Sequence, residues 1–303
     1  MKSEFTVGTR KSQLAMVQTK LVVEALQQHF PDVKFVIKKI TTQGDRNLKD
    51  SLQKIGGKGV FVKEIEHQLE DQSIDFAVHS LKDVMPNLPA DLTIGCIPKR
   101  NSPFDCLITP KPIKAITDLP QGARIGTNSL RRQGQLLHQR PDLEIIPIRG
   151  NVETRIKKIA SEHLDGVVLA EAGLNRLGVD LAGLYRLTLE GVILPATGQG
   201  AIAIECRKND SDTLQLLSVI ADEPTRQSVL VERSFLRRLG GSCNYPIGAY
   251  AYHDGNRIQF KGLVASADGK HLFAKHKAGQ PDEILGTKVA DLLISEGALD
   301  LIQ

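Results

Sequence analysis

The sequence predicts an α/β fold of two doubly wound domains, followed by a small α+β domain at the C-terminal end. Three observations predict this class. Strand segments alternate with amphipathic helical segments over residues 5–78, the same alternation starts again near residue 124, and short strands joined by Asp-Gly turns follow residue 249. At 303 residues the chain is also long for a single hydrophobic core, so two or three domains are expected.

The first half of the chain begins with a strand at residues 5–8 and an amphipathic helix over residues 12–29. A β-branched strand at 34–42 comes next, and then a helix that starts with four residues rich in glycine and covers 56–69. A short buried strand at 74–78 follows that helix. Alternation of this kind predicts a parallel sheet with helices on both faces.

The second half repeats the alternation, with strands predicted at 124–127, 144–148 and 166–170, each followed by a helix. Both halves contain a strand, a Gly-Thr pair and a serine at a helix start, and these serines are Ser12 and Ser129. Free backbone N–H groups and a hydroxyl at a helix start suit an anion, although an ordinary N-cap explains each serine taken alone. Two such sites with arginines beside both favour one ligand cleft between paired domains.

The last third of the chain changes character. A strand at 201–205 is expected to rejoin the first sheet, which makes the first domain discontinuous and gives a two-stranded hinge. A helix at 225–239 follows. Three short strands joined by Asp-Gly turns come next, at 250–252, 257–260 and 271–274, and a final helix covers 282–296. The predicted domains are therefore 1–99 with 200–218, 104–194, and 222–303.

Composition describes an ordinary soluble globular protein, with 41% hydrophobic and 24% charged residues. The first eight residues contain no apolar h-region, so a secretory leader is not expected, and the sequence has no apolar run long enough to span a bilayer. Its four cysteines have no Cys-x-x-Cys spacing, which argues against structural zinc, any other metal and a disulfide scaffold. These features predict a cytoplasmic protein with reduced thiols and no membrane partner.

The charge distribution is more informative than the net charge of +4. Residues 124–158 contain eight Lys and Arg side chains against three acidic ones. Nucleic acid is a poor candidate partner, because aromatic residues make up 4% of the chain, tryptophan is absent, and no nucleic-acid-binding motif is present. Arginine outnumbers lysine here, which suits forked recognition of individual carboxylates or phosphates. A small polyanion is the expected ligand.

Cys243 lies on a loop that follows a cationic helix end and two glycines, Gly240 and Gly241. The glycines allow the backbone to leave the helix in a left-handed turn, and Pro246 stiffens the exit. A thiol presented in this way serves as a nucleophile or as an attachment point. The alternative is a small buried residue beneath a turn.

A second candidate for chemistry is the segment His79 to Asp83, which follows a buried strand at the edge where open α/β sheets bind ligands. On the surface, Lys82 and Asp83 would form an ion pair that contributes little to stability. In a cleft, Lys82 would instead bind an acidic ligand and Asp83 would act as an acid–base group. The glycine-rich stretch at 56–59 lacks the spacing of an ATP-binding loop, so a mobile lid carrying Lys54 and Lys58 is the better interpretation.

Seven segments, in the same order and spread over nearly the whole chain, resemble the porphobilinogen deaminase (hydroxymethylbilane synthase) family. Any one of them is a weak signal, but seven in order are highly specific. They are residues 9–15, 56–61, 79–83, 126–132, 149–155, 198–200 and the Cys243 loop at 237–248.

The resemblance implies an enzyme of tetrapyrrole synthesis whose first two domains resemble type II periplasmic binding proteins. It implies that Cys243 holds a dipyrromethane cofactor through a thioether, and that four porphobilinogen molecules are deaminated, joined in turn and released as a linear tetrapyrrole by hydrolysis. Asp83 is the expected acid–base group, which stabilises positive charge on pyrrole nitrogens. A monomer without metal is expected.

The resemblance also assigns cofactor- and substrate-binding residues, most of them cationic or hydroxylic, with Gln199 at a hinge. They are Arg10, Ser12, Lys54, Lys58, Phe61, Lys82, Thr127, Ser129, Arg131, Arg132, Arg149, Gly150, Arg155, Arg176 and Gln199. The chemistry of the residues agrees, because each porphobilinogen ring carries two carboxylates and a growing chain needs many forked cations. Departures from the family pattern at Asn128, Met85 and Ser242 affect local loop shape.

Two alternatives compete with this hypothesis. A non-catalytic small-anion binding protein of the same two-domain fold accounts for the paired anion sites and the hinge. It does not need Lys82 and Asp83 at the cleft, or a displayed cysteine on a third domain. A thiol enzyme using Cys243 as its nucleophile needs a histidine base, for which His253 is the nearby candidate.

Overall fold

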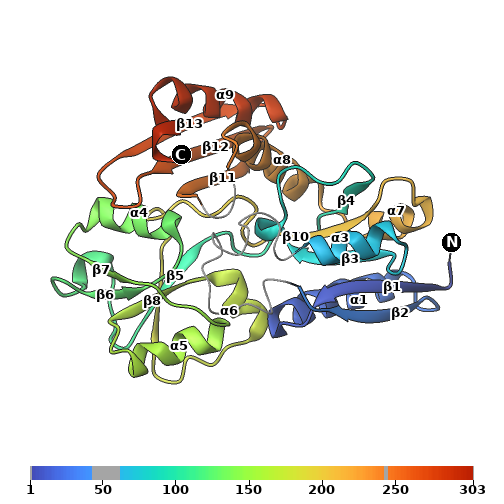
Figure 1. The fold of residues 1–303 in the computed structure, drawn as a ribbon, viewed down its shortest axis with the longest axis horizontal. Coiled ribbons are helices and arrows are strands. Elements are labelled where there is room, and N and C mark those ends of the chain that lie inside the picture. The colour runs from blue at the N-terminus through green and yellow to red at the C-terminus, as the bar shows by residue number, and fades with distance from the viewer. Residues whose placement is uncertain (1, 43–61, 242–244, 303) are drawn as a thin grey trace. The chain divides into compact units, whose positions relative to one another are not determined.

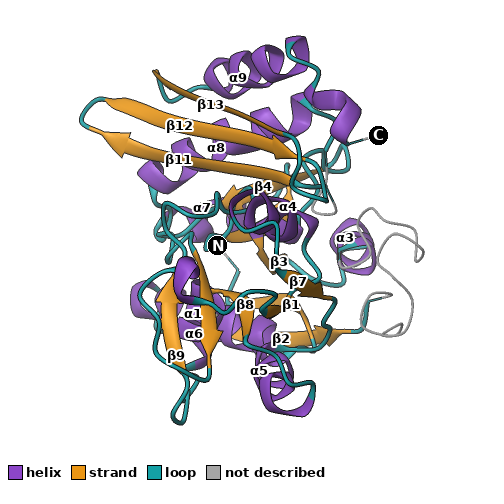
Figure 2. Ribbon diagram, turned by 90° about the vertical axis from the view of Figure 1, so that its left-hand side faces the viewer, coloured by secondary structure: helices purple, strands orange, loops and turns teal. Residues whose placement is uncertain are grey.

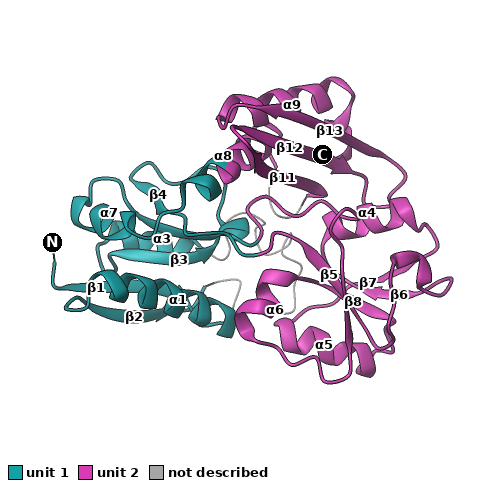
Figure 3. Cartoon of the chain, turned by 180° about the vertical axis from the view of Figure 1, so that it is seen from behind, with its two compact units in different colours: residues 1–101, 200–227 teal, residues 102–199, 228–303 magenta. Residues whose placement is uncertain are grey.

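The computed structural model describes residues 2–42, 62–241 and 245–302 (Figure 1). The chain divides into two compact units, the first made of 1–101 with 200–227 and the second of 102–199 with 228–303 (Figure 3). Each unit contains a five-stranded sheet, and the second unit also contains a three-stranded sheet, within the described residues. The fold is therefore mixed α/β, with two sheet-and-helix parts and a smaller C-terminal sheet with helices.

The sheet of the first unit has the strand order β2-β1-β3-β10-β4. Its strands are β1 (Glu4–Arg10), β2 (Lys34–Ile40), β3 (Phe76–Ser80), β4 (Leu92–Cys96) and β10 (Ile202–Arg207). β1 pairs in parallel with β2 and β3, whereas β10 runs antiparallel to both β3 and β4. The expected return of residues 201–205 to the first sheet is confirmed.

The expectation of a parallel sheet is wrong at β10. No crossover helix of the first unit directly precedes β10, because the chain re-enters this unit only after residues 102–199 of the second unit. Parallel neighbours need such a crossover, whereas an antiparallel strand enters the sheet without one. Helices do cover both faces, as predicted. They are α1 (Gln13–His29) and α7 (Ser211–Ser218) over one apolar cluster, and α3 (Lys63–Glu70) over the other.

The five-stranded sheet of the second unit repeats this arrangement in the order β7-β6-β8-β5-β9. Its strands are β5 (Asp105–Thr109), β6 (Arg124–Gly126), β7 (Glu144–Ile146), β8 (Gly166–Ala170) and β9 (Tyr185–Thr188). β5 runs antiparallel to β8 and β9, so it occupies the place that β10 has in the first sheet. The helices are α4 (Leu130–Gln139), α5 (Val152–Ser161) and α6 (Glu171–Leu177), with 3-10 turns at Leu81–Asp83 (η1) in the first unit and Ile116–Asp118 (η2) here.

The C-terminal sheet is an antiparallel meander of β11 (Ile247–Asp254), β12 (Arg257–Ala265) and β13 (Leu272–Gly279). It packs with α8 (Glu223–Arg238), α9 (Glu283–Ser295) and the turn η3 (Ala298–Leu301) around one apolar cluster (Figure 2). Phe235 and Phe260 meet edge to face at its centre, with ring centroids 5.3 Å apart. The predicted Asp-Gly turns are present, and Gly269 adopts a φ of 73° that favours glycine.

Candidate active site

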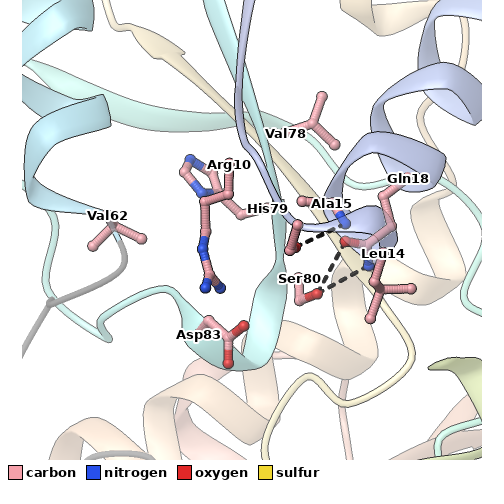
Figure 4. Close-up of a pocket in the computed structure, with 10 residues that line it drawn as sticks. Arg10, Leu14, Ala15, Gln18, Val62, Val78, His79, Ser80 and Asp83 are labelled. Carbon is pink, nitrogen blue, oxygen red and sulfur yellow. Dashed lines mark hydrogen bonds between the residues drawn. The ribbon is translucent and has the colours of Figure 1, made fainter. Parts of the chain in front are cut away.

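Parallel strands β1 and β3 end at the same edge of the first sheet, and a pocket lies there (Figure 4). Parallel strands align their carboxyl ends, which is why residues far apart in sequence meet at this edge. The pocket is lined by Arg10, Ser12, Leu14, Ala15, Gln18, Val62, Val78, His79, Ser80 and Asp83. Three of the predicted site residues, Arg10, Ser12 and Asp83, are therefore brought together in one pocket.

Asp83 is half-buried at the end of η1, directly after β3. The Arg10 side chain, from the end of β1, points toward the Asp83 carboxylate (Figure 4). The turn itself is anchored, because the backbone N–H of Leu81 donates to the carbonyl of Ala201 at 3.1 Å. The Ser80 hydroxyl also bonds the Gln18 side chain, whose Nε2 donates at 2.9 Å. Asp83 thus stands on a braced turn beside a cation.

The two serines that follow a Gly-Thr pair at a helix start, Ser12 and Ser129, make different hydrogen bonds. Ser12 is the N-cap of α1, and its hydroxyl accepts from the Ala15 N–H at 3.3 Å, so the capping interpretation holds for this residue. Ser129 stands at the N-cap of α4 without a side-chain capping bond. Its backbone N–H instead donates to the hydroxyl of buried Thr127 at 3.2 Å. The Ser12 hydroxyl is therefore partly engaged by its own helix, whereas the Ser129 hydroxyl does not cap α4.

In the second unit, one buried carboxylate organises the predicted arginines of α4. Arg131 donates to Asp105 Oδ2 at 2.7 Å, and Arg132 donates to Oδ1 through Nη2 at 2.7 Å and through Nε at 3.0 Å. Gln199 Nε2 also reaches Oδ1, at 3.0 Å. All four side chains are buried. Two guanidiniums around one carboxylate leave a net positive charge in this part of the protein.

The ionisation of this cluster follows from competing effects. Burial acts to raise the pKa of Asp105, but Arg131 and Arg132 override it and hold that pKa well below the ordinary range. Burial lowers the pKa of Arg131, opposed by Asp105 and reinforced by Arg132. The ion pairs are therefore charged at neutral pH. Arg131 also donates to the main-chain carbonyl of Leu194, and Arg132 to that of Val168.

Three more predicted cations lie in the same unit. Arg155 on α5 donates from Nε to the carbonyl of Gly150 at 2.8 Å, and burial together with Arg132 and Arg149 lowers its pKa to about 10. Burial lowers the pKa of Arg176 on α6 to about 10 as well. Gly150 needs its glycine, because it has a φ of 118° and a Cβ there would lie 2.7 Å from the Thr154 methyl. Half-buried guanidiniums that repel one another form a natural receptor for several carboxylates.

The predicted residues that the structure describes divide between the two units. Arg10, Ser12, Lys82 and Asp83 belong to the first unit, and the second unit contains Thr127, Ser129, Arg131, Arg132, Arg149, Gly150, Arg155, Arg176 and Gln199. Lys54, Lys58, Phe61 and Cys243 lie outside the described residues. Within the described ranges, no group of three or more His, Cys, Asp or Glu side chains is arranged to hold a metal ion.

Sequence reasoning did not find Asp105. Its signal was an aspartate at the start of the apolar segment Asp105–Thr109, where a charge entering a buried strand requires a partner. His79 and Glu205 were also missed as a pair, although their side chains are almost fully buried and their Nε2 and Oε2 atoms lie 3.1 Å apart. Glu205 stands in the same way within an apolar strand.

Comparison with known proteins shows the family of the chain. A family model described as "Porphobilinogen deaminase, dipyromethane cofactor binding domain" matches residues 5–215. A second, described as "Porphobilinogen deaminase, C-terminal domain", matches residues 226–295. The chain belongs to the porphobilinogen deaminase family. The resemblance first seen in seven short segments is therefore confirmed.

Curated relatives extend the match to full length. The porphobilinogen deaminase of Limosilactobacillus reuteri is 56% identical over 303 residues, covering 100% of this chain and 99% of the relative. That of Brevibacillus brevis is 48% identical, covering 99% and 96%. Among solved structures, the periplasmic VFT2 domain of Bordetella pertussis BvgS is similar with a TM-score of 0.43 and 16% identity, over 71% of this chain and 85% of that domain.

The residues present fit the cofactor that the family description names. A dipyrromethane assembled from two porphobilinogen molecules would carry two carboxylates on each ring, and the described arginines of the matched region, 5–215, include half-buried cations at α5 and α6. Arg132 and Arg149 act on Arg155 through like-charge repulsion, which an anionic ligand relieves. Among the described residues, no helix is long and apolar enough to cross a membrane.

Proposed function

We propose that this protein condenses four porphobilinogen molecules head to tail, releasing ammonia at each step and then a linear tetrapyrrole, hydroxymethylbilane, by hydrolysis. It is thus a transferase of porphyrin and haem biosynthesis. The observation that carries the proposal is the set of cations that runs from Arg10, at the end of β1, to Arg155 on α5 and Arg176 in the last turn of α6, in a chain that belongs to this family throughout. A substrate with two carboxylates per ring needs such a surface.

The proposed cofactor is a dipyrromethane attached by a thioether to Cys243. When bound, it supplies the free pyrrole end to which substrate is joined. Cys243 follows the two glycines at the end of α8, of which Gly240 has a φ of 65°. This left-handed turn ends the helix shortly before Cys243 in the sequence. No metal takes part in the proposed reaction.

Asp83 is the proposed catalytic residue. Its carboxylate is held on the braced turn η1, where it interacts with positive charge as the substrate loses ammonia and as each new bond forms. Arg10 lies across the pocket and points toward that carboxylate (Figure 4), so it orients Asp83 and offers a donor to an incoming carboxylate. Lys82, on the same turn, adds a second cation.

The remaining residues bind acetate and propionate side chains. The proposal assigns this role to hydroxyl groups at helix starts, to guanidiniums of the second unit and to residues of the 54–61 segment. They are Ser12, Thr127, Ser129, Arg131, Arg132, Arg149, Gly150, Arg155, Arg176, Lys54, Lys58 and Phe61. In this scheme, Asp105 neutralises only one of the two positive charges of Arg131 and Arg132, and the other attracts the carboxylates of the ligand. Gln199, which also bonds Asp105, lies at the proposed hinge.

The proposal includes the organisation of the molecule. Its domains are 1–99 with 200–218, 104–194, and 222–303, the last of which carries the cofactor cysteine. The enzyme works as a cytoplasmic monomer on a small-molecule substrate, without nucleic acid or membrane partners. The predicted charge pattern supports this, since cations concentrate over 124–158 while aromatic residues are few.

The test is to incubate the purified protein with porphobilinogen and measure ammonia and tetrapyrrole in the same sample. The proposal predicts four ammonia molecules for each hydroxymethylbilane formed. A protein that binds porphobilinogen, as seen by calorimetry, yet releases no ammonia would instead be the non-catalytic anion-binding protein. A matched sample of the Asp83→Asn variant controls for spontaneous condensation.

A further inference from the structure

A set of ionisable side chains lies under the pocket of the first unit, in the layer between its sheet and α3. Glu205 on β10 is 0% exposed, His79 on β3 is 4% exposed, and Glu66 on α3 is half-buried. The surrounding layer is apolar and consists of Ile40, Ile65, Leu69, Ile74, Ala77 and Leu92. Acidic groups in such a layer need a reason beyond packing.

The strand register explains how these groups meet. Ala203 pairs with His79, and Glu205 pairs with Ala77, in the antiparallel ladder of β10 and β3. Paired residues share a face, so Glu205 and His79 are diagonal neighbours on the face that α3 covers. The Glu205 Oε2 and His79 Nε2 atoms lie 3.1 Å apart. Within the described residues, neither Glu205 oxygen has an aligned hydrogen bond, so His79 is the near partner of this buried carboxylate.

Stability does not account for this pair. Removing ionisable groups from water is costly in such surroundings, and well-packed apolar side chains of similar volume are often as stabilising or more so. An ionisable pair of this kind beside a pocket instead indicates a role at the site. Its location supports that, because His79 lines the pocket and Asp83 follows it by four residues.

We propose that Glu205 fixes His79 as a positioning residue for the Asp83 turn, and that Glu66, on the helix that covers this face of the sheet, belongs to the same cluster of ionisable groups. This inference rests on the proposed function of the pocket. His79 is the penultimate residue of β3, and the turn η1 begins two residues later. Holding the His79 ring therefore fixes the end of the strand from which Asp83 is presented, while Glu66 sets the charge beneath the pocket.

The electrostatic surroundings of Glu66 give the cluster its pH dependence. Burial and Glu205 raise the pKa of Glu66 to about 7, with His79 and Lys63 acting to lower it and Glu70 to raise it. The charged groups that line the pocket together with His79 are Arg10 and Asp83. As pH rises through about 7, Glu66 loses its proton and adds one negative charge near the pocket. An anionic substrate is then bound more weakly, so KM rises with pH.

The direct test is a carboxyl ¹³C NMR titration of the holoenzyme, with the Glu66 signal assigned by its loss in Glu66→Gln. We expect a midpoint near pH 7. It should move down in Glu205→Gln, because Glu205 acts to raise the pKa of Glu66, and up in His79→Gln, because His79 acts to lower it. Glu24→Gln, an exposed change on α1, is the control and should leave the midpoint unchanged.

The kinetic test measures kcat and KM for porphobilinogen between pH 6 and 8.5. Glu66→Gln should flatten the rise in KM with pH. Glu205→Gln should lower kcat by roughly tenfold to a hundredfold, as expected for a misplaced catalytic group, while cofactor loading measured by mass stays normal. Glu205→Asp should restore part of that loss.

An unchanged Glu66 midpoint in both Glu205→Gln and His79→Gln would overturn the cluster, as would a pH-dependent KM that persists in Glu66→Gln. Glu66 is half-buried, so that variant is expected to fold and keeps the kinetic test informative even where Glu205 variants are unstable. The NMR titration needs no turnover. If the wild-type protein does not turn over porphobilinogen but the Glu66 midpoint shifts as expected in the variants, the proposed function is contradicted and the cluster is supported.

Discussion

Asp105 is a buried carboxylate of the second unit that holds side chains from two separate segments. Its two oxygens accept hydrogen bonds from Arg131, Arg132 and Gln199, side chains that come from α4 and from the loop after Leu194. A buried carboxylate with two guanidinium partners is electrostatically satisfied, but each partner depends on it. Removing the carboxylate would leave two guanidiniums without their counter-ion.

Asp105→Asn should destabilise the protein by about 3–5 kcal/mol at pH 7, because it leaves buried positive charge uncompensated. Urea unfolding followed by circular dichroism measures this. The folded-state pKa of Asp105 is depressed, so its contribution is present above the ordinary aspartate pKa and is lost as pH falls through the folded value. The difference between wild type and variant should thus be constant from pH 5 to 8 and shrink in stronger acid.

The control for this experiment is Asp91→Asn, which changes an exposed aspartate. It should leave the urea midpoint close to that of the wild type. Equal midpoints for Asp105→Asn and the wild type at pH 7 would contradict the assigned role of Asp105.

At Asp83, geometry matters more than charge. Asp83→Glu keeps the carboxylate but moves it along the side chain by one methylene, away from the position that η1 and Arg10 define. We expect the cofactor to load normally and kcat to fall roughly 10²-fold or more. Steady-state rates together with the intact mass of the variant measure both. Near-normal turnover in Asp83→Glu would sink the catalytic assignment, and Asp91→Glu serves as the matched exposed control.

The sequence predicted the residues of the pocket better than it predicted their partners. Asp83 was expected at the ligand-binding edge of the sheet because it follows a buried strand. Ser12 was expected at an anion-binding helix start, and Arg10 was assigned by the family resemblance. The three residues do line one pocket. The sequence did not predict the roles of Asp105 and Glu205, because each lies in an apolar strand. Their partners come from segments far along the chain, and sequence periodicity carries no information about such distant pairs.

At the scale of elements, α8 links parts of the second unit through one buried glutamate. Glu232 Oε2 accepts from the Gly198 N–H at 2.7 Å, and its Oε1 accepts from the Ala251 N–H on β11 at 3.0 Å. Gly198 has a φ of 70°, so the loop before Gln199 makes a left-handed turn toward this carboxylate. The loop that carries Gln199 is thus tied to the helix that leads to the Cys243 segment.

Glu232→Ala should lower the free energy of unfolding by about 2–5 kcal/mol, since two buried N–H groups lose their acceptor. Thermal and urea unfolding measure the loss. Glu190→Ala, an exposed change in the same unit, should have little effect. If both variants unfold at the wild-type midpoint, the Glu232 carboxylate does not hold this loop.

Elements with strong periodicity were predicted well from the sequence. The strand at 166–170 matches β8 to the residue, and the final helix differs from α9 only by its capping residues. Strands β4, β5 and β9 were not predicted. β9 is short and largely exposed, and β5 begins with an aspartate, so neither gives the alternating or wholly apolar pattern on which strand prediction depends.

At the scale of the whole molecule, the first unit is built from two separate stretches of chain. β10 lies between β3 and β4, and its Ile204 and Cys206 side chains belong to the apolar cluster beneath α1 and α7. The stretches meet where the chain leaves and returns, because the Asn101 N–H donates to the Gly200 carbonyl at 3.1 Å. A discontinuous domain therefore has adjacent ends.

This adjacency predicts that residues 1–101, joined through a short Gly-Ser linker to 200–227, fold without the rest of the chain. Residues 1–101 alone should not, because they lack the strand next to both β3 and β4. Dispersion of amide signals in a ¹H–¹⁵N NMR spectrum distinguishes the two outcomes. Equal dispersion for both polypeptides would contradict the structural need for β10.

The most direct test of the central claim is the mass of the denatured protein, followed by peptide mapping across Cys243. The account predicts an excess equal to one dipyrromethane, located on the Cys243 peptide and missing in Cys243→Ser. A bare thiol calls for prior incubation with porphobilinogen, which converts an apoenzyme to the loaded form. A thiol that stays unmodified after that incubation would contradict the assignment of this chain as a porphobilinogen-condensing enzyme.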